Sequence, residues 1–382
     1  MKQLPRYALE MLNILQFAGF EAYAVGGCVR DAVMGKTATD IDTTTSAKPE
    51  EIQALFPHSF LTGGAYYTVT ALHGGGKAEI TPFRSEGGYS DSRRPDSVSF
   101  ASGLPEDLNR RDFTINTLCL DGERIIDLHG GQADIEAKVI RCVGDAERRF
   151  NEDALRIMRA FRFAATLGFD IEESTLNAAL LCADNLKNIS VERIRDELIK
   201  TAISPAPERI NPLLKSGALG FLRLHASPLL AKVASLPDDT ETRFSAFLEV
   251  CGRDALDRLK LPTRQKRVIR AVFNLLDCFP APEKNAVKRA MSTFSAKVFL
   301  IAAEIGENVY GKSSEYIALF FEIAERKEPY RVSDLEVNGR DLISAGIPKA
   351  EIGDELKRLL ESVIDDPEIN TKERLLELLK RQ

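Results

Sequence analysis

Several features that would place a chain in a membrane or outside the cell are absent from this sequence. No stretch approaches the roughly eighteen uninterrupted apolar residues of a membrane-spanning helix. The first residues lack the apolar core and small-residue cleavage site of a signal peptide. The six cysteines form no CxxC pair, and only four histidines occur. Because disulfide and zinc frameworks need paired ligands, we expect the cysteines to be reduced, mostly buried thiols. Together these absences predict a cytoplasmic protein without a membrane anchor.

Two further absences bear on the partners of the chain. No GxxxxGK[S/T] phosphate-binding loop occurs, which argues against a P-loop nucleotide hydrolase. The chain also has no excess of basic residues. Its net charge is −6, whereas proteins that coat long nucleic acids are usually basic. Any contact with RNA must therefore come from a local basic surface, as in an enzyme that holds one compact RNA end. Nothing in the sequence implies a stable protein partner.

The texture of the sequence changes near residue 145, and 382 residues are enough for two to four domains. Short strand patterns and helices alternate before this point, and helical periodicity of 3.6 residues continues after it. We therefore expect an α+β fold with a mixed β-sheet head followed by an all-α region. The predicted parts are a head over 1–144, a helical neck over 145–212, a helical body over 213–310 and a helical tail over 311–382.

Within the head, local patterns predict individual elements. Strands are expected over 21–27, 39–46, 66–73 and 77–83, and helices over 11–19 and from 29. The segment 84–97, RSEGGYSDSRRPDS, has almost no apolar residues and is predicted to be a loop.

The first candidate site combines VGGCVRD at 25–31 with DID at 40–42. Alternate side chains of a strand share a face, so Asp40 and Asp42 would point the same way and could share two divalent cations such as Mg²⁺. Gly26 and Gly27 would let the backbone approach a triphosphate, and Arg30 would donate to it. A DxD pair alone is weak, because surface aspartates are common; the compound pattern is far more specific.

Two more segments carry candidate residues with an open alternative each. Glu79, on the alternating strand KAEITPF, is either a solvated carboxylate or a third acidic group beside the DxD pair. In EDLNRRDFTIN at 106–116, Arg111 belongs to a positive pair, and Asp112 and Asn116 could hydrogen-bond a ribose or base. The alternative for this second segment is a helix N-terminus with a charged first turn.

A fourth candidate is RFNEDALRIMRAFRF at 149–163. Treated as one helix, it places Asp153, Arg156, Arg159 and Arg162 three residues apart in a polar stripe. Such a stripe can be an ordinary salt-bridged, solvated face. Alternatively, stacked arginines repel one another and favour an anionic partner, and Asp153 with Arg156 could match the Watson–Crick edge of a base. The spacing leaves both interpretations open.

Together these motifs resemble the class II tRNA nucleotidyltransferase family, which comprises CCA-adding enzymes and bacterial poly(A) polymerases. The matching segments follow the family's order over roughly residues 20–200. They are VGGCVRD, DID, EITPFR, YSDSRRPDSVSF, DLNRRDFTIN, DLHGGQADI, VGDAERRFNEDALRIMRAFRFAATLGF and SVERIRDEL.

The resemblance implies roles for these residues. Asp40 and Asp42 would hold the metals and Glu79 would complete the carboxylate set. The triphosphate would meet Gly27 and Arg30. The remaining implied nucleotide-binding residues are Arg111, Asp112 and Asn116 at the ribose and phosphates, Asp153 and Arg156 at the base, and Arg159 and Arg162 as supports.

The implied activity is addition of C, C and A, from CTP and ATP, to the 3′ end of tRNA without a nucleic-acid template. The complete YSDSRRP loop favours addition of the terminal A, and the lack of a long basic C-terminal extension favours CCA addition over poly(A) synthesis. The alternatives are a poly(A) polymerase, a partial CC- or A-adding enzyme, and a non-catalytic RNA-binding homologue. The last is disfavoured by the intact carboxylates.

Overall fold

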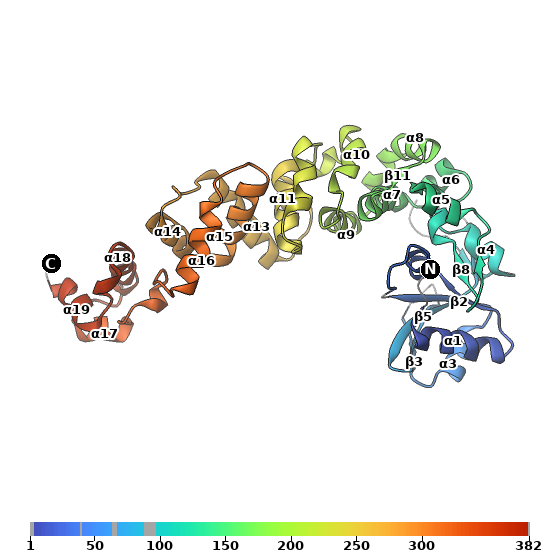
Figure 1. Cartoon of the computed structure of the whole chain (residues 1–382), viewed down its shortest axis with the longest axis horizontal. Coiled ribbons are helices and arrows are strands. Elements are labelled where there is room, and N and C mark those ends of the chain that lie inside the picture. Colours follow the sequence, from blue (N-terminus) through green and yellow to red (C-terminus); the bar gives the residue numbers. More distant parts are fainter. Residues whose placement is uncertain (1–3, 39, 63–66, 88–96, 381–382) are drawn as a thin grey trace. The chain divides into compact units, whose positions relative to one another are not determined.

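The computed structural model describes residues 4–38, 40–62, 67–87 and 97–380 (Figure 1). Contacts divide the chain into two compact units, Met1–Phe221 and Leu222–Gln382. The first unit contains every strand of the described chain, and the second is built from helices. This arrangement confirms the predicted α+β class with a mixed sheet followed by an all-α region. The finer division into neck, body and tail stays a prediction.

A seven-stranded sheet forms the centre of the first unit. In spatial order its strands are β3 (Ser59–Leu61), β4 (Val69–His73), β5 (Gly76–Pro82), β2 (Ile41–Thr45), β1 (Ala22–Val25), β8 (Cys119–Leu120) and β9 (Ile125–Ile126). The β2 and β5 strands are parallel, and the other neighbouring pairs are antiparallel. The four predicted strand segments thus correspond to β1, β2, β4 and β5.

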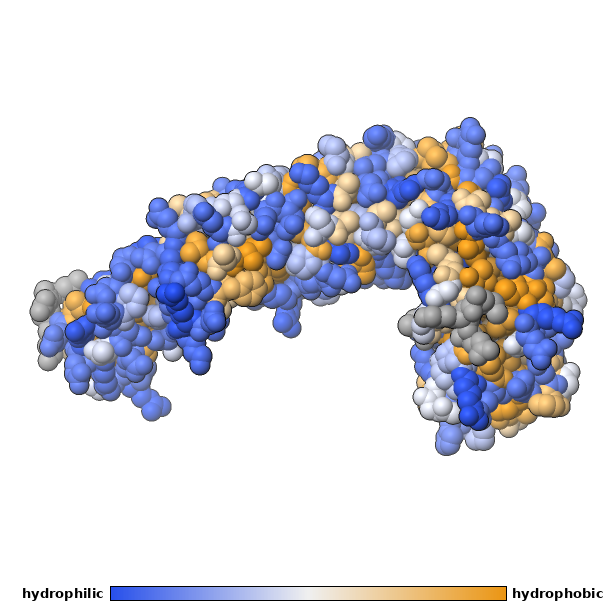
Figure 2. All heavy atoms as spheres, in the orientation of Figure 1, coloured by the Kyte–Doolittle hydropathy of each residue, from blue (hydrophilic) through white to orange (hydrophobic). Residues whose placement is uncertain are grey.

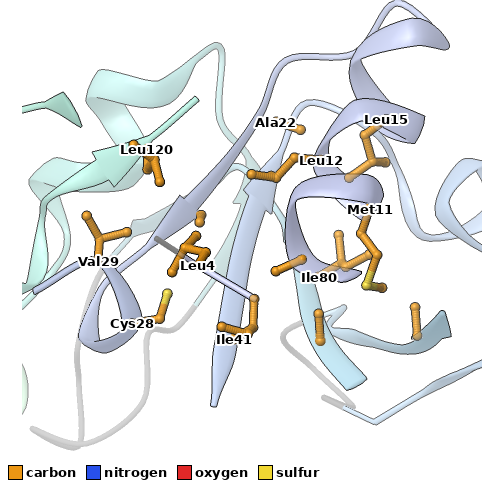
Figure 3. Close-up of a cluster of buried hydrophobic side chains, with 14 of the residues drawn as sticks. Leu4, Met11, Leu12, Leu15, Ala22, Cys28, Val29, Ile41, Ile80 and Leu120 are labelled. Carbon is orange, nitrogen blue, oxygen red and sulfur yellow. The ribbon is translucent and has the colours of Figure 1, made fainter. Parts of the chain in front are cut away.

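One face of this sheet is covered by the helices α1 (Arg6–Phe17) and α3 (Pro49–Leu55), which contribute to a common apolar core. Figure 3 shows Met11, Leu12 and Leu15 of α1 close to Ile80 of β5. Burial of each large aliphatic side chain of this kind stabilises the fold by about 1.5–3 kcal/mol. Since strand side chains alternate, burying Ile41 and Ile80 here turns Asp42 and Glu79 to the opposite face.

The helix α2 (Gly27–Val33) adds Cys28, Val29 and Ala32 to the apolar core of α1 and α3. The opposite face carries the helix α4 (Leu104–Asn109), whose Leu104 and Leu108 pack with Val25 and Phe83, and the hairpin of β6 (Arg84–Gly87) and β7 (Ser97–Phe100). The prediction of a loop over the whole of 84–97 was wrong at both ends. Polar residues form these strands because the hairpin is a separate two-stranded sheet, which does not require an apolar face. The rest of the predicted loop, 88–96, lies outside the described residues.

Short helices and one small parallel sheet complete the first unit. The helices are α5 (Gly131–Ala137), α6 (Ala146–Glu152), α7 (Leu155–Leu167), α8 (Glu173–Leu181), α9 (Val191–Ala202) and α10 (Asn211–Lys215), and β10 (Val139–Ile140) pairs with β11 (Asp170–Ile171). The α7 helix ends at Gly168, whose φ of 69° is a left-handed conformation that glycine adopts without strain.

The prediction of one helix across 149–163 was wrong. The chain breaks at Asp153, which has extended backbone angles of φ −138° and ψ 100° and separates α6 from α7. The Asp153 carboxylate accepts a hydrogen bond from the backbone N–H of Leu155 at 3.1 Å, as a helix cap does. A short side chain that bonds the backbone locally thus competes with helix continuation here.

The second unit consists of packed helices. They are α11 (Thr240–Cys251), α12 (Ala255–Arg258), α13 (Thr263–Asp277), α14 (Lys284–Phe294), α15 (Ala296–Asn308), α16 (Glu315–Glu325), α17 (Gly339–Ser344), α18 (Ile352–Asp365) and α19 (Lys372–Lys380). Figure 2 shows that the drawn face of this unit is largely hydrophilic, with hydrophobic atoms gathered near α16, where Phe321 is 57% exposed. None of the helices within the described ranges is long and apolar enough to cross a membrane.

The cysteines agree with the sequence prediction. All six are free thiols, and five of them are buried; only Cys278 is exposed.

Candidate active site

A polar cleft of about 450 Å³ opens in the first unit between the sheet and the helices α7 and α9. It brings together all the predicted site residues except Glu79, Asp153 and Arg156. The lining residues are Gly26, Gly27, Cys28, Arg30, Asp31, Asp40, Asp42, Arg111, Asp112, Asn116, Arg159, Arg162, Phe163 and Lys200.

Asp40 and Asp42 supply the acidic end of the cleft. Asp42 is the second residue of β2, whereas Asp40 precedes the first, so only one of the two is within the strand as predicted. Both residues are solvent-accessible. Removal of surrounding water by the cleft walls, the Glu79 carboxylate and Asp40 together raise the pKa of Asp42 to about 6, with Arg111 opposing them. A bound cation would therefore stabilise the ionised form of the Asp42 carboxylate.

Glu79 lies beside this pair without lining the cleft. It is the residue of β5 that pairs with Asp42 in the parallel register, so both side chains are on the same face. The Glu79 carboxylate is half exposed and lies 4.0 Å from the ammonium of Lys77. Its charge acts on Asp42, as the raised pKa of Asp42 reflects. Within the described part of the chain, no group of three or more His, Cys, Asp or Glu side chains is close enough to hold a metal ion.

The glycine pair lies where β1 turns into α2. Gly26 has φ 80°, a conformation that side chains rarely adopt, and a Cβ there would lie 3.5 Å from Nη1 of Arg111. Arg30 is 8% exposed, and its guanidinium donates to Asn116 Oδ1 at 2.8 Å and to Asp31 Oδ1 at 2.8 Å. The predicted triphosphate donor is thus already part of an internal network.

That network continues through the 111–116 segment to α7. Asn116 donates to Asp112 Oδ1 at 3.2 Å, and Nε of Arg159 donates to Asp112 Oδ2 at 2.7 Å. Burial alone would raise the pKa of Asp112, but the Arg159 charge and the hydrogen bonds from Arg159 and Asn116 lower it to about 2. Asp112 therefore stays ionised and joins residues from distant parts of the sequence in one rigid wall. The alternative of a helix N-terminus with a charged first turn holds for Glu106 and Asp107, which lie in the first turn of α4. Asp112 lies beyond that helix, and Asn116 ends the 3₁₀ turn Thr114–Asn116.

The arginines of α7 do not form the unpaired stripe that their spacing suggested. Arg156 pairs with Glu152 at 3.1 Å, Arg159 pairs with Asp112, and Arg162 pairs with Glu197. The alternative of a solvated face was also wrong for Arg156, which is 7% exposed. These carboxylates offset the mutual repulsion of the arginines. Glu152 is four residues from Arg156, whereas Asp112 and Glu197 come from segments remote in sequence, which helical spacing could not reveal.

Asp153 and Arg156, the predicted base readers, lie outside the cleft lining. The Asp153 carboxylate is 3.6 Å from the Arg193 guanidinium, and loss of water raises its pKa, with Arg193 opposing the shift. Arg156 donates to the backbone oxygens of Arg149 and Arg110 at 3.2 and 3.0 Å, besides its pair with Glu152. The structure thus brings the two residues to the start of α7, where the backbone N–H of Arg156 donates to the backbone oxygen of Asp153 at 3.0 Å.

Three residues important to the site were missed by the sequence analysis. Asp107 is fully buried and accepts hydrogen bonds from Arg110 at 2.6 Å and Arg111 at 3.2 Å. Its position three and four residues before the arginine pair was a signal that helical spacing rules could have found. Phe163 and Lys200 also line the cleft. No local pattern distinguishes them, because their role depends on how α7 and α9 pack.

Two segments of the chain match models of known protein families. Residues 22–141 match the model of the poly A polymerase head domain, and residues 168–230 match that of a probable RNA- and SrmB-binding site of polymerase A. The CCA-adding enzyme of Lactobacillus helveticus is 37% identical, over 94% of this chain and 92% of that protein. The one from Leuconostoc mesenteroides is 36% identical, over 99% and 97%.

A solved structure has the same fold over almost the whole chain. The crystal structure of the Bacillus stearothermophilus CCA-adding enzyme in complex with CTP superimposes with a TM-score of 0.85 and 31% identity, covering 98% of this chain and 96% of that one. The Thermotoga maritima enzyme, solved with tRNA, shares the fold at a TM-score of 0.67 and 22% identity.

Proposed function

The chain belongs to the family of CCA-adding enzymes, which are tRNA nucleotidyltransferases, and we propose that it adds C, C and A from CTP and ATP to the 3′ end of tRNA. The observation that carries the proposal is the cleft itself, in which two accessible aspartates and several arginines face one space. Carboxylates suit divalent cations, and guanidinium groups suit phosphates, so the cleft matches a nucleoside triphosphate bound with metal.

Enzymes of this family generally use divalent metal ions, and we propose Mg²⁺ for this chain. Asp40 and Asp42 fit such an ion, because both present hard oxygen ligands to the cleft. Loss of water and the charges of Glu79 and Asp40 raise the pKa of Asp42, so a nearby cation would stabilise its ionised form. Bound there as a pair, the cations would lower the pKa of the attacking hydroxyl and neutralise the leaving pyrophosphate. Glu79 would support Asp42 from the neighbouring strand.

The reaction would be an in-line displacement at the α-phosphorus. The O3′–phosphorus bond forms, the bond from the α-phosphorus to the bridging oxygen breaks, the hydroxyl proton passes to solvent, and pyrophosphate leaves. We assign the triphosphate and ribose to Gly26, Gly27, Arg30 and the wall of Arg111, Asp112 and Asn116. Catalysis by this wall would be mainly positioning, since its ion pairs are already formed.

We assign base selection to Asp153 and Arg156, with Arg159 and Arg162 holding the nucleotide from α7. An acidic acceptor and a guanidinium fork present complementary patterns to cytosine and adenine. Arg156 is engaged by backbone oxygens and Glu152, so base pairing would require it to exchange those partners. Because tRNA, CTP and ATP are the reactants, the proposed site of action is the cytoplasm.

End-addition experiments test the proposed function. The full chain is incubated with tRNA lacking its terminal CCA, with CTP, with ATP or with both, and the products are sequenced. We expect two C residues with CTP alone and a complete CCA end with both nucleotides. Long A tails on an unrelated RNA would instead identify a poly(A) polymerase. Addition that stops after CC, or that requires a preformed CC end, would identify a partial enzyme.

A further inference from the structure

The two sides of the cleft differ in charge. Asp31 lies on α2, Asp40 directly precedes β2 and Asp42 lies within it, whereas α7 and α9 contribute Arg159, Arg162 and Lys200. The sheet side also contains Arg30 and Arg111 and thus suits cations together with a triphosphate, whereas the helical side suits a further anion. The helical side is therefore a candidate binding surface for an anionic group of a substrate.

Among the described residues, Lys200 differs from the other cations of the cleft because no carboxylate pairs with it. Arg30, Arg111, Arg159 and Arg162 each form an ion pair, with Asp31, Asp107, Asp112 and Glu197 respectively. For Lys200, the part of the chain that the structure describes provides no acidic group within ion-pair distance. Its side chain is on α9, one turn after Glu197, and it is exposed at the cleft.

Lys200 also has a pre-arranged neighbour. The Nε of Arg162 donates a hydrogen bond to the carboxylate of Glu197, which is 5% exposed. The Arg162 guanidinium lies 3.9 Å from the centre of the Phe163 ring. Arg162 is therefore fixed against α9 close to the turn that carries Lys200. An arginine held by one carboxylate and a lysine held by none leave an excess positive charge, which favours a phosphate.

We propose that Lys200, next to Arg162, binds the last phosphodiester of the RNA end that is being extended. This inference rests on the proposed function. In-line attack requires the 3′-hydroxyl to approach opposite the leaving pyrophosphate, so the RNA end and the triphosphate need separate anchors. The triphosphate is assigned to the glycine pair and the aspartates and the base to α7, which leaves Lys200 of α9 for the RNA. The α9 helix also lies within residues 168–230, the region similar to a probable RNA-binding site.

The test compares Lys200→Gln, Lys200→Arg and a matched control, Lys187→Gln. Lys187 is an exposed lysine of the same unit that pairs with Asp184 and does not line the cleft. For each protein, KM is measured separately for tRNA lacking CCA and for CTP. Binding of the same tRNA is measured without nucleotide at several salt concentrations.

For Lys200→Gln we expect the KM for tRNA to rise about tenfold, as loss of one charge-assisted contact implies. The KM for CTP should change less than twofold. The slope of log affinity against log salt should fall by roughly 0.7–1, because one phosphate contact is lost. Lys200→Arg should restore most of the affinity, and Lys187→Gln should match the wild type.

Three results would overturn the proposal. A higher KM for CTP with unchanged tRNA affinity would assign Lys200 to the triphosphate. Unchanged KM values for tRNA and for CTP, with unchanged tRNA affinity, would show that Lys200 binds no phosphate of either substrate. An equal loss in Lys187→Gln would show an effect of overall charge only. If the wild-type protein bound tRNA but added no nucleotide, the proposed function would fail, whereas the binding data would still decide the role of Lys200.

Discussion

Replacing Asp107 with asparagine tests whether a buried carboxylate positions the nucleotide-binding arginines. Asp107 is fully buried and accepts hydrogen bonds from Arg110, Arg111, Thr44 and the backbone N–H of Arg84. An asparagine of the same shape keeps one oxygen but presents N–H groups where the second oxygen accepted donors. The variant therefore leaves two arginines beside a neutral amide.

The expected loss of stability follows from the buried ion pairs that the substitution removes. Breaking a buried ion pair by removing one charge costs about 3–5 kcal/mol in the free energy of unfolding. For a domain of this size, that cost corresponds to a fall in the urea midpoint of roughly 1–2 M. Nucleotide incorporation should fall as well, even where the variant is folded, because Arg111 loses the group that holds it against Gly26.

The pH dependence of stability provides a second measurement. Burial alone would raise the pKa of Asp107, but Arg111 and Arg110 outweigh it and lower the pKa below its ordinary value of 3.8. A lowered pKa means that the stabilisation is complete above the unfolded-state pKa and is lost as the pH falls through the folded-state value. The wild type should therefore lose this contribution in acid, whereas Asp107→Asn should lack that loss.

Urea unfolding followed by circular dichroism, at neutral and acidic pH, measures both effects. Glu106→Gln is the matched control, because Glu106 is the preceding residue but is exposed and bonds to Ser102. Its midpoint should equal that of the wild type. If Asp107→Asn unfolded at the same urea concentration as the wild type, the assignment of Asp107 as a buried electrostatic hub would be wrong.

Three other predictions concern the cleft and the start of α7. Asp40→Asn or Asp42→Asn should reduce CMP incorporation at least a hundredfold with tRNA binding retained, since the carboxylates act on the metal; near-normal turnover in single-nucleotide assays would contradict this. Because the pKa of Asp42 is about 6, affinity for Mn²⁺ should weaken as the pH falls through 6 and protonation removes the negative charge; a titration followed by electron paramagnetic resonance that gave one affinity from pH 5 to pH 8 would refute it. Asp153→Ala should lose discrimination between CTP and UTP more than it loses Mn²⁺ affinity, and competition assays that showed an intact preference would exclude Asp153 from base selection.

Patterns that depend on neighbouring residues were readable without the structure. Alternation in the 77–83 segment placed Glu79 opposite Ile80, because a strand with one buried face must alternate. The end of α7 at Gly168 also depends on a local property, since glycine adopts the left-handed backbone there without strain. The compound motif around Asp40 and Asp42 also identified the acidic end of the cleft, because its residues follow each other on adjoining elements.

Only the tertiary structure decided which charges meet. Asp112 and Arg159 are separated by 47 residues, Arg162 and Glu197 by 35, and Arg30 and Asn116 by 86. An ion pair between remote segments depends on how helices and strands pack, and no local period encodes that packing. The same packing buries Arg156 and leaves Lys200 exposed at the cleft. The sequence thus determined which chemical groups the site contains, and the fold determined which of them neutralise one another and which remain available to a substrate.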